Sequence, residues 1–175
     1  MRIIGIDPGS GGTGYGIIDT DGSEHHLVLY GAIQTSAKKP FHDRLLKIHN
    51  ELNKILAHEK ADAMAIEEVF YAVNIQAALR LGHARGVALL SAAEHGLSVH
   101  EYSPLEIKSA VVGYGRADKF QIQSMVRLLL KLPELPTPDH AADALAIAIC
   151  HANQLCRLTV AEVGRRSRNP IKYPG

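Results

Sequence analysis

Residues 2–35 read RIIGIDPGSGGTGYGIIDTDGSEHHLVLYGAIQT, and this stretch decides the expected fold. Residues 2–7 are a short, β-branched run that stops at a Pro-Gly pair, which predicts a buried strand. Residues 13–19 predict a second strand, and an Asp-Gly turn leads into a third at about residues 26–35. Three consecutive strands joined in this way predict an antiparallel meander.

The remainder of the chain alternates between helical and strand patterns. Strands are expected at residues 63–69 and 97–102, and helices at 41–59, 74–95, 104–112, 118–131 and from Thr137 onward. In the last helix, Thr137 can cap the N-terminus and Pro138 suits the first turn. The order predicts an α/β fold with one mixed sheet of five strands, in which parallel strands follow the meander and helices cover both faces.

Length and charge divide the chain into two parts. The 175 residues, 46% of them hydrophobic, are enough for one domain with one core, which we place at residues 1–156. Residues 157–175 are predicted to be a basic, flexible tail, because five basic residues there face the single acid Glu162. The net charge is only +1, so a surface for nucleic acid would have to arise from local clustering.

The cysteines and the hydropathy pattern indicate in which cellular compartment the protein is expected. Cys150 and Cys156 form neither a CxxC pair nor a disulfide framework, which fits a reducing environment. No run approaches the roughly 20 apolar residues that a membrane helix needs. We therefore expect a cytoplasmic protein.

Two of the predicted strands end in carboxylates. Asp7 closes the first strand just before a glycine-rich turn, where an aspartate can also serve only to start the turn. Glu67 and Glu68 end the strand at 63–69, and alternation sends them to opposite faces of the sheet. Only one of them can therefore join a given cluster, and spacing does not decide which. A salt bridge or a solvated strand end is the alternative.

A third acidic position lies in the last helix. His140 and Asp143 are three residues apart and so share one helical face. The helix is otherwise rich in alanine, which lets its backbone lie close against the sheet. An aspartate in so apolar a helix is costly unless it is paired or bound to a cation, and the imidazole itself could be that partner.

The three acidic sites together favour a functional interpretation if they converge on one point of the fold. Three carboxylates and an imidazole at one point would repel one another or stay protonated unless divalent cations neutralised them. Such a cluster is typical of a two-metal phosphoryl-transfer centre, in which ions roughly 3.5–4 Å apart activate a water and stabilise the leaving oxygen.

Several segments together resemble the RuvC Holliday junction resolvases. They are GIDPGSGGTGYG, AIEEVF, ALRLGHARG, VVGYGRADK, and MVRLLLKLP followed by DHAADALAIAI, and the resemblance covers about residues 1–153. It implies an RNase H-like fold and a homodimer that nicks four-way junctions symmetrically in two strands, leaving 5′-phosphates, in DNA recombination and repair. It also implies a partner in the RuvA–RuvB branch-migration complex.

The resemblance assigns the metal ligands. It makes Asp7 the first ligand, Glu67 the second and Asp143 the last, whereas Glu68 falls where the family is not committed to an acid. His140 stands where many members carry aspartate and others histidine. The implied cofactors are two divalent cations, Mg²⁺ by resemblance, and a nitrogen ligand suits Mn²⁺ as well. Asp139 is out of phase with the motif and is read as a helix N-terminal residue favoured by the dipole.

The matched segments also carry candidate contacts to DNA. Phe70 matches the position implicated in opening the junction, and Tyr71 beside it is suited to stacking on unpaired bases, although buried aromatics are the usual alternative. The candidate phosphate contacts are Arg80, Arg85, Lys108, Arg116 and Lys119. Each of these alone could be a solvated surface charge. The apolar residues of the 74–95 helix are the expected dimer interface, in competition with the monomer core.

Two other functions fit parts of the pattern. An actin- or hexokinase-like ATP-binding domain also begins with a strand-end aspartate and glycines, but it needs a second phosphate loop and a duplicated domain. A catalytically inactive junction-binding protein would have the same DNA-binding surface, but it would not need Asp7, Glu67 and Asp143 to be intact.

Overall fold

The computed structural model describes residues 1–68 and 74–166, with side chains as far as residue 156. Its strands form one mixed sheet in the order β3-β2-β1-β4-β5. The strands are β1 (Arg2–Asp7), β2 (Gly12–Thr20), β3 (His25–Gln34), β4 (Ala63–Glu67) and β5 (Ser98–Tyr102). The first three are antiparallel, whereas β4 is parallel to β1 and to β5. The predicted meander followed by parallel strands is confirmed.

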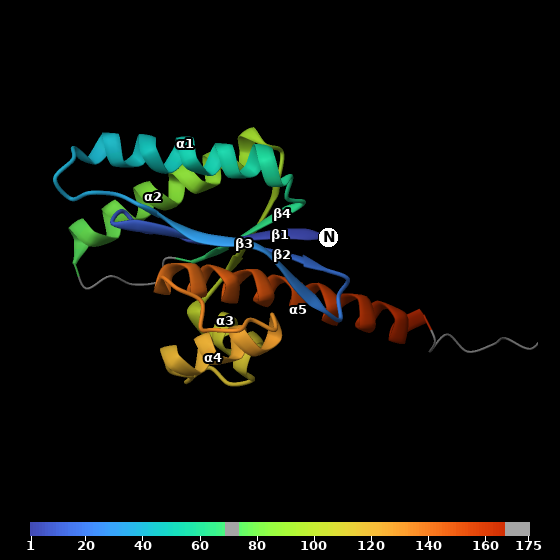
Figure 1. Cartoon of the computed structure of the whole chain (residues 1–175). Coiled ribbons are helices and arrows are strands. Elements are labelled where there is room, and N and C mark those ends of the chain that lie inside the picture. Colours follow the sequence, from blue (N-terminus) through green and yellow to red (C-terminus); the bar gives the residue numbers. More distant parts are fainter. Residues whose placement is uncertain (69–73, 167–175) are drawn as a thin grey trace, which may run out of the picture.

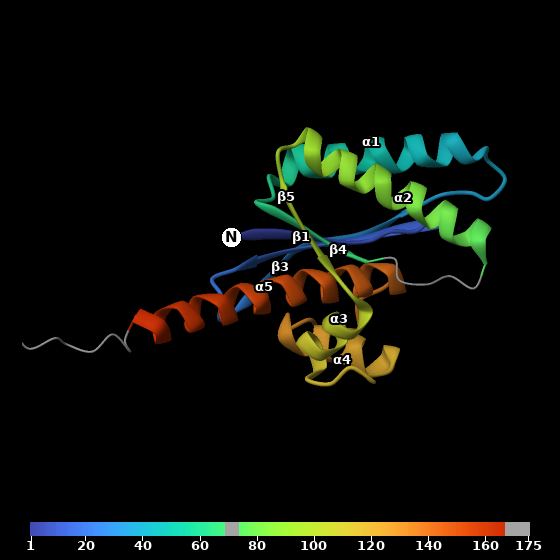
Figure 2. The ribbon, with the colours of Figure 1, turned by 180° about the vertical axis from the view of Figure 1, so that it is seen from behind.

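Helices cover both faces of this sheet, as predicted (Figure 1, Figure 2). They are α1 (Phe41–Glu59), α2 (Ile75–Glu94), α3 (Pro104–Val112), α4 (Lys119–Leu129) and α5 (Asp139–Arg166). The first two pack on one face, and α5 lies along the other with α3 and α4 beneath it. None of the described helices is long and apolar enough to cross a membrane.

Alternation along β1 assigns its side chains to two cores. Ile4 and Ile6 are fully buried with residues of α1 and α2, while Ile3 is buried with residues of α5. Because strand neighbours point to opposite faces, Asp7 must point to the same side as Ile3. The face that carries α5 is therefore the face that carries the first predicted carboxylate.

Glycines let α5 approach β1 and β2 very closely. A Cβ at Gly5 would lie 2.0 Å from the carbonyl oxygen of Ala144, and one at Gly14 would lie 1.9 Å from that of His140. A side chain at either position would force the helix to move, because real Cβ atoms essentially never lie within 3.0 Å of a heavy atom of a distant residue. Ala144 and Ala148, whose backbone atoms lie nearest to the position of a Gly5 Cβ, are themselves fully buried. The predicted close seating of an alanine-rich helix is confirmed.

Both ends of α5 differ in detail from the sequence prediction. The helix begins at Asp139, and the carbonyl of Pro138 accepts hydrogen bonds from the amides of Ala141 and Ala142. Pro138 thus occupies the capping position rather than the first turn, so the predicted start at Thr137 was too early. At the other end, the helical backbone continues to Arg166. The flexible tail predicted from residue 157 stays a prediction, because residues 167–175 lie outside the described part.

Candidate active site

Parallel pairing brings Asp7 and Glu67 to the same edge of the sheet. Ile6 pairs with Ile66 in the β1–β4 ladder, so the next residue of each strand is an acid at the strand's carboxyl end. Ile66, like Ile6, is buried with α1 and α2. Glu67 therefore points to the opposite face, where it lines a pocket together with Asp7. Of the two glutamates that alternation could not distinguish, the structure brings Glu67 and not Glu68 to this pocket.

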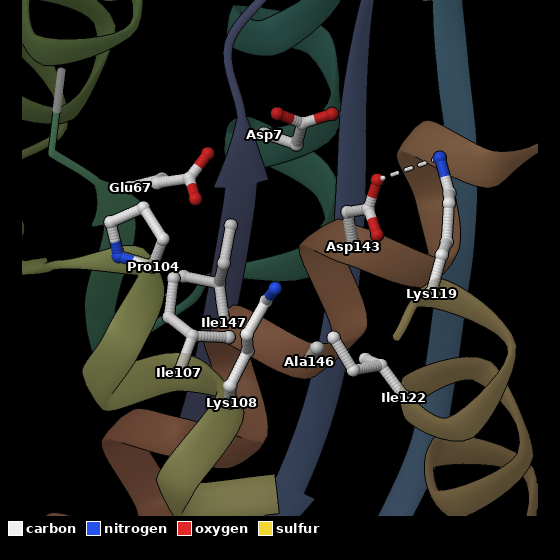
Figure 3. A pocket seen from close by; sticks show the side chains of 10 residues that line it. All are labelled: Asp7, Glu67, Pro104, Ile107, Lys108, Lys119, Ile122, Asp143, Ala146 and Ile147. Atoms are coloured by element: carbon white, nitrogen blue, oxygen red, sulfur yellow. Dashed lines mark ion pairs between the residues drawn. The ribbon is translucent and has the colours of Figure 1, made fainter. Parts of the chain in front are cut away.

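The first turns of α5 supply the remaining members. Nδ1 of His140 lies 2.6 Å from Oδ2 of Asp7 and is hydrogen-bonded to it. One potential ligand atom from each of Asp7, His140 and Asp143 lies within 4.8 Å of the others, the spacing of a group that could hold a metal ion. Glu67 stands across from Asp7 and Asp143 in a pocket of about 250 Å³ (Figure 3). The convergence predicted from sequence is thus present.

The carboxylates of the pocket disfavour one another's charge. Burial raises the pKa of Asp7, and Asp143 adds to the rise, while His140 and Lys119 oppose it. Burial, with the charges of Asp7 and Asp143, raises the pKa of Glu67 to about 7, against the opposing effect of Lys108. A divalent cation would relieve both effects, because it replaces the missing solvation with a positive charge.

Two lysines also line the pocket, and in Figure 3 the ammonium group of Lys119 lies beside Asp143. Lys108 of α3 and Lys119 of α4 both line it. Nζ of Lys119 lies 3.4 Å from Asp143 and 3.1 Å from Asp139. Asp139 also accepts a hydrogen bond from Gln123, so it lies outside the ligand group, in agreement with its being out of phase.

Of the other predicted DNA contacts that the structure describes, none lines the pocket, and one is paired with a residue of the protein itself. Arg80 and Arg116 are exposed and are not among the pocket's lining residues. Phe70 and Tyr71 lie outside the described residues, so their predicted stacking role is untested. Arg85 turns inward: its guanidinium forms an ion pair with Glu101 and a hydrogen bond to the main chain of β4.

Arg44 of α1 is a residue that the sequence analysis missed. Its guanidinium donates to the carbonyl of Ser10 and to Oγ1 of Thr35, which itself donates to the same carbonyl at 2.6 Å. These bonds fix the loop that follows Asp7. No sequence pattern marks such a residue, because its main partner is a backbone atom 34 residues away in the chain.

Comparisons with known proteins agree on one family. The family described as "Crossover junction endodeoxyribonuclease RuvC" matches residues 3–151. Proteins of that name from Ruminiclostridium cellulolyticum and Koribacter versatilis are 52% and 51% identical to this chain, over 87% and 91% of it and 92% and 96% of their own lengths. The solved structure of Thermus thermophilus RuvC in complex with a Holliday junction substrate is similar, with a TM-score of 0.87 and 36% identity over 91% of this chain and 97% of that one. The fold is RNase H-like, as expected.

Proposed function

Since the chain belongs to the RuvC family of crossover junction endodeoxyribonucleases, we propose that it resolves Holliday junctions by hydrolysing phosphodiester bonds symmetrically in two DNA strands. The observation that carries this proposal is the meeting of Asp7, His140 and Asp143 within 4.8 Å, with Glu67 lining the same pocket. The match to a relative solved with junction DNA supports the substrate. The same carboxylates argue against an inactive junction-binding protein.

The residues present fit divalent cations. Carboxylate oxygens are the ligands that Mg²⁺ prefers, and the imidazole of His140 suits Mn²⁺. Asp7, Glu67, His140 and Asp143 would hold two cations, which when bound activate water and neutralise charge on the scissile phosphate. The raised pKa values of Asp7 and Glu67 support this assignment, because they reflect burial and the charges of neighbouring carboxylates, which the nearby His140, Lys108 and Lys119 offset only in part.

The remaining groups of the pocket place the substrate. Lys108 and Lys119 bring positive charge to the pocket from α3 and α4, opposite the acids of β1 and β4. Ammonium groups in this position would bind the phosphates on either side of the bond to be cut. Ile107, Ile122 and Ile147 line the same pocket, and their apolar surface limits the water around the reacting phosphate.

The symmetry of the substrate favours a dimeric enzyme. A four-way junction has a near two-fold axis, so a homodimer with an isologous interface presents two active sites to two equivalent strands. Ile75, Leu79 and Leu90 of α2 are large apolar side chains that remain exposed, which supports this helix as the interface. A branch-migration complex of the RuvA–RuvB kind would supply the junction, in the cytoplasm where bacterial DNA lies.

The test is to remove single ligands without changing their size. Asp7→Asn and Glu67→Gln should retain junction binding and lose cleavage by at least about 10²-fold, which corresponds to about 2.7 kcal/mol of transition-state stabilisation. Cleavage of a labelled synthetic junction in Mn²⁺ and in Mg²⁺, alongside binding in EDTA, measures both quantities.

Glu68→Gln is the matched control, because it makes the same chemical change one residue along the same strand end. It should cleave at the wild-type rate. Cleavage that survives Asp7→Asn would show that the centre is assigned to the wrong residues, and equal losses in Glu67→Gln and Glu68→Gln would remove the role given to Glu67.

A further inference from the structure

Arg85 lies behind the strand that carries Glu67. Its Nε donates a hydrogen bond of 3.4 Å to the carbonyl oxygen of Glu67, and its Nη2 forms an ion pair with Glu101 of β5. One guanidinium of α2 therefore joins the last residue of β4 to the neighbouring strand. Arginine suits this position, because its planar fork of donors can hold two acceptors at once in a fixed geometry.

The sheet separates Arg85 from the pocket. Glu101 pairs with Ile66 in the β4–β5 ladder, and Ile66 is buried on the side of α1 and α2. Paired residues of neighbouring strands point to the same face, so Glu101 and its partner Arg85 lie on that side. Glu67 lines the pocket on the α5 side. Arg85 thus contacts the backbone of Glu67 from the face opposite to its carboxylate.

Arg85 is engaged in a way that competes with contact to DNA. Its side chain is only 18% exposed, and its charge is already paired with Glu101. A phosphate contact would require it to leave a carboxylate and a carbonyl, both of which would lose their partner.

Among the described residues, the end of β4 is also held by its pairing with β5, in which Glu67 lies opposite Tyr102. The ladder continues one residue further, where the amide of Glu68 donates to the carbonyl of Tyr102 at 2.8 Å. Beyond Glu67 the strand ends, and side chains at strand ends move with their backbone. A group that holds the Glu67 carbonyl therefore limits the movement of the backbone from which the carboxylate extends.

We propose that Arg85 is a positioning residue for the cleavage reaction, holding the end of β4 so that the Glu67 carboxylate is directed toward Asp7 and Asp143. The inference rests on the proposed function, since it gives Glu67 its task as a metal ligand. Groups that orient a metal ligand are commonly worth about 10- to 100-fold in metal affinity or activity.

The experiment compares Arg85→Ala and Arg85→Lys with the wild-type chain. Mn²⁺ binding without DNA is followed by electron paramagnetic resonance, single-turnover junction cleavage is followed in Mn²⁺, and junction binding is measured in EDTA at several salt concentrations. Arg85→Ala should bind Mn²⁺ about tenfold or more weakly and cleave about 10- to 100-fold more slowly. Junction affinity and its salt dependence should stay unchanged. Arg85→Lys should lie between, because an ammonium keeps the charge but not the fork.

Lys54→Ala is the control for loss of a positive charge, because Lys54 is exposed on α1 and pairs with Glu51. It should match the wild type in all three measurements. Thermal unfolding of every variant identifies effects of stability, and all binding is measured well below the lowest melting temperature. If Arg85→Ala does not fold, Arg85→Lys and Glu101→Gln make the same comparison.

Two results would overturn the inference. Weaker junction binding with a salt slope reduced by about 1 would make Arg85 a phosphate contact. Unchanged Mn²⁺ affinity in the folded variants, with or without a lower melting temperature, would leave it a purely structural residue. Either result can occur while Asp7→Asn still abolishes cleavage, so failure of this inference is distinct from failure of the proposed function.

Discussion

At the scale of single residues, the carboxyl of Glu67 holds its proton more tightly than a free glutamate does. Burial and the neighbouring Asp7 and Asp143 raise its pKa from the ordinary 4.5 to about 7. A group whose pKa is raised in the folded state contributes stability that is complete below its unfolded pKa. That stability is lost as the pH rises through the folded pKa, so here the loss falls between about pH 4.5 and 7.

This linkage gives a prediction for the metal-free protein. The free energy of unfolding of the wild type, relative to that of Glu67→Gln, should fall as the pH rises from about 4.5 to about 7. Urea unfolding in EDTA across this range measures the difference, and Glu68→Gln should follow the wild type. A difference that is flat with pH would mean that Glu67 is not buried among charges as the structure has it.

His140 is the residue that we expect to influence which metal the site prefers. It is hydrogen-bonded to Asp7 and is the only nitrogen donor of the four ligands proposed here. Replacing it with an oxygen donor in His140→Asp should raise the rate in Mg²⁺ relative to that in Mn²⁺ by about tenfold, or about 1.4 kcal/mol. The ratio of single-turnover rates in the two metals measures this. An unchanged ratio would show that His140 does not contact the metal.

The residues of the site differ in how far a sequence can reveal them. Asp7 and Asp143 could be singled out as candidates because an acid in an apolar setting is costly unless it is paired or bound to a cation, and His140 because it shares a helical face with Asp143. The choice of Glu67 over Glu68 needed the structure or a resemblance, because alternation alone fits either. The sequence predicts Arg85 as a phosphate contact, because it shows the charge of this residue but not the carbonyl and the carboxylate that the side chain contacts.

At the scale of elements, α5 brings half of the site to the sheet. Its approach depends on Gly5 and Gly14, where a Cβ would enter the helix backbone. The contact at Gly14 is with the carbonyl of His140 itself. The same contact therefore holds α5 against the sheet and places the proposed ligand His140.

Gly14→Ala should consequently damage both stability and metal binding. The added methyl must push α5 from β2, and overpacking of this kind costs about 1–3 kcal/mol. Thermal unfolding and Mn²⁺ affinity measure the two effects. Gly11→Ala is the matched control, because a Cβ there meets nothing within 4 Å, and it should change stability by no more than about 0.5 kcal/mol. Equal behaviour of the two variants would contradict the close contact.

The elements themselves were largely predictable, and their ends were not. Apolar runs and helical periodicity predicted the strands and helices of the described part, because strands such as β1 are buried on both faces and helices such as α1 bury one face. The start of α5 was placed too early, since a Thr-Pro pair fits both the residues before a helix and its first turn. Here the carbonyl of Pro138 accepts the first helical hydrogen bonds, which only the backbone geometry shows.

At the scale of the whole molecule, a chain with a net charge of only +1 has to bind DNA, which is highly negative. We propose that the positive charge that meets the DNA is local and includes Lys108 and Lys119, which line the pocket. Lys108→Ala should weaken junction binding and reduce the salt slope of the binding constant by about 1. Binding in EDTA from about 50 to 200 mM salt measures the slope. An unchanged slope, equal to that of Lys54→Ala on α1, would show that Lys108 meets no phosphate.

The most direct test of the central claim is a crystal structure of the protein with a four-way junction and Mn²⁺, in which anomalous scattering locates the metal. The proposed centre predicts two peaks in each protomer, roughly 3.5–4 Å apart, contacted by Asp7, Glu67, His140 and Asp143 beside a phosphate of the junction. The absence of a peak from this pocket, with metal bound elsewhere near the DNA, would contradict it.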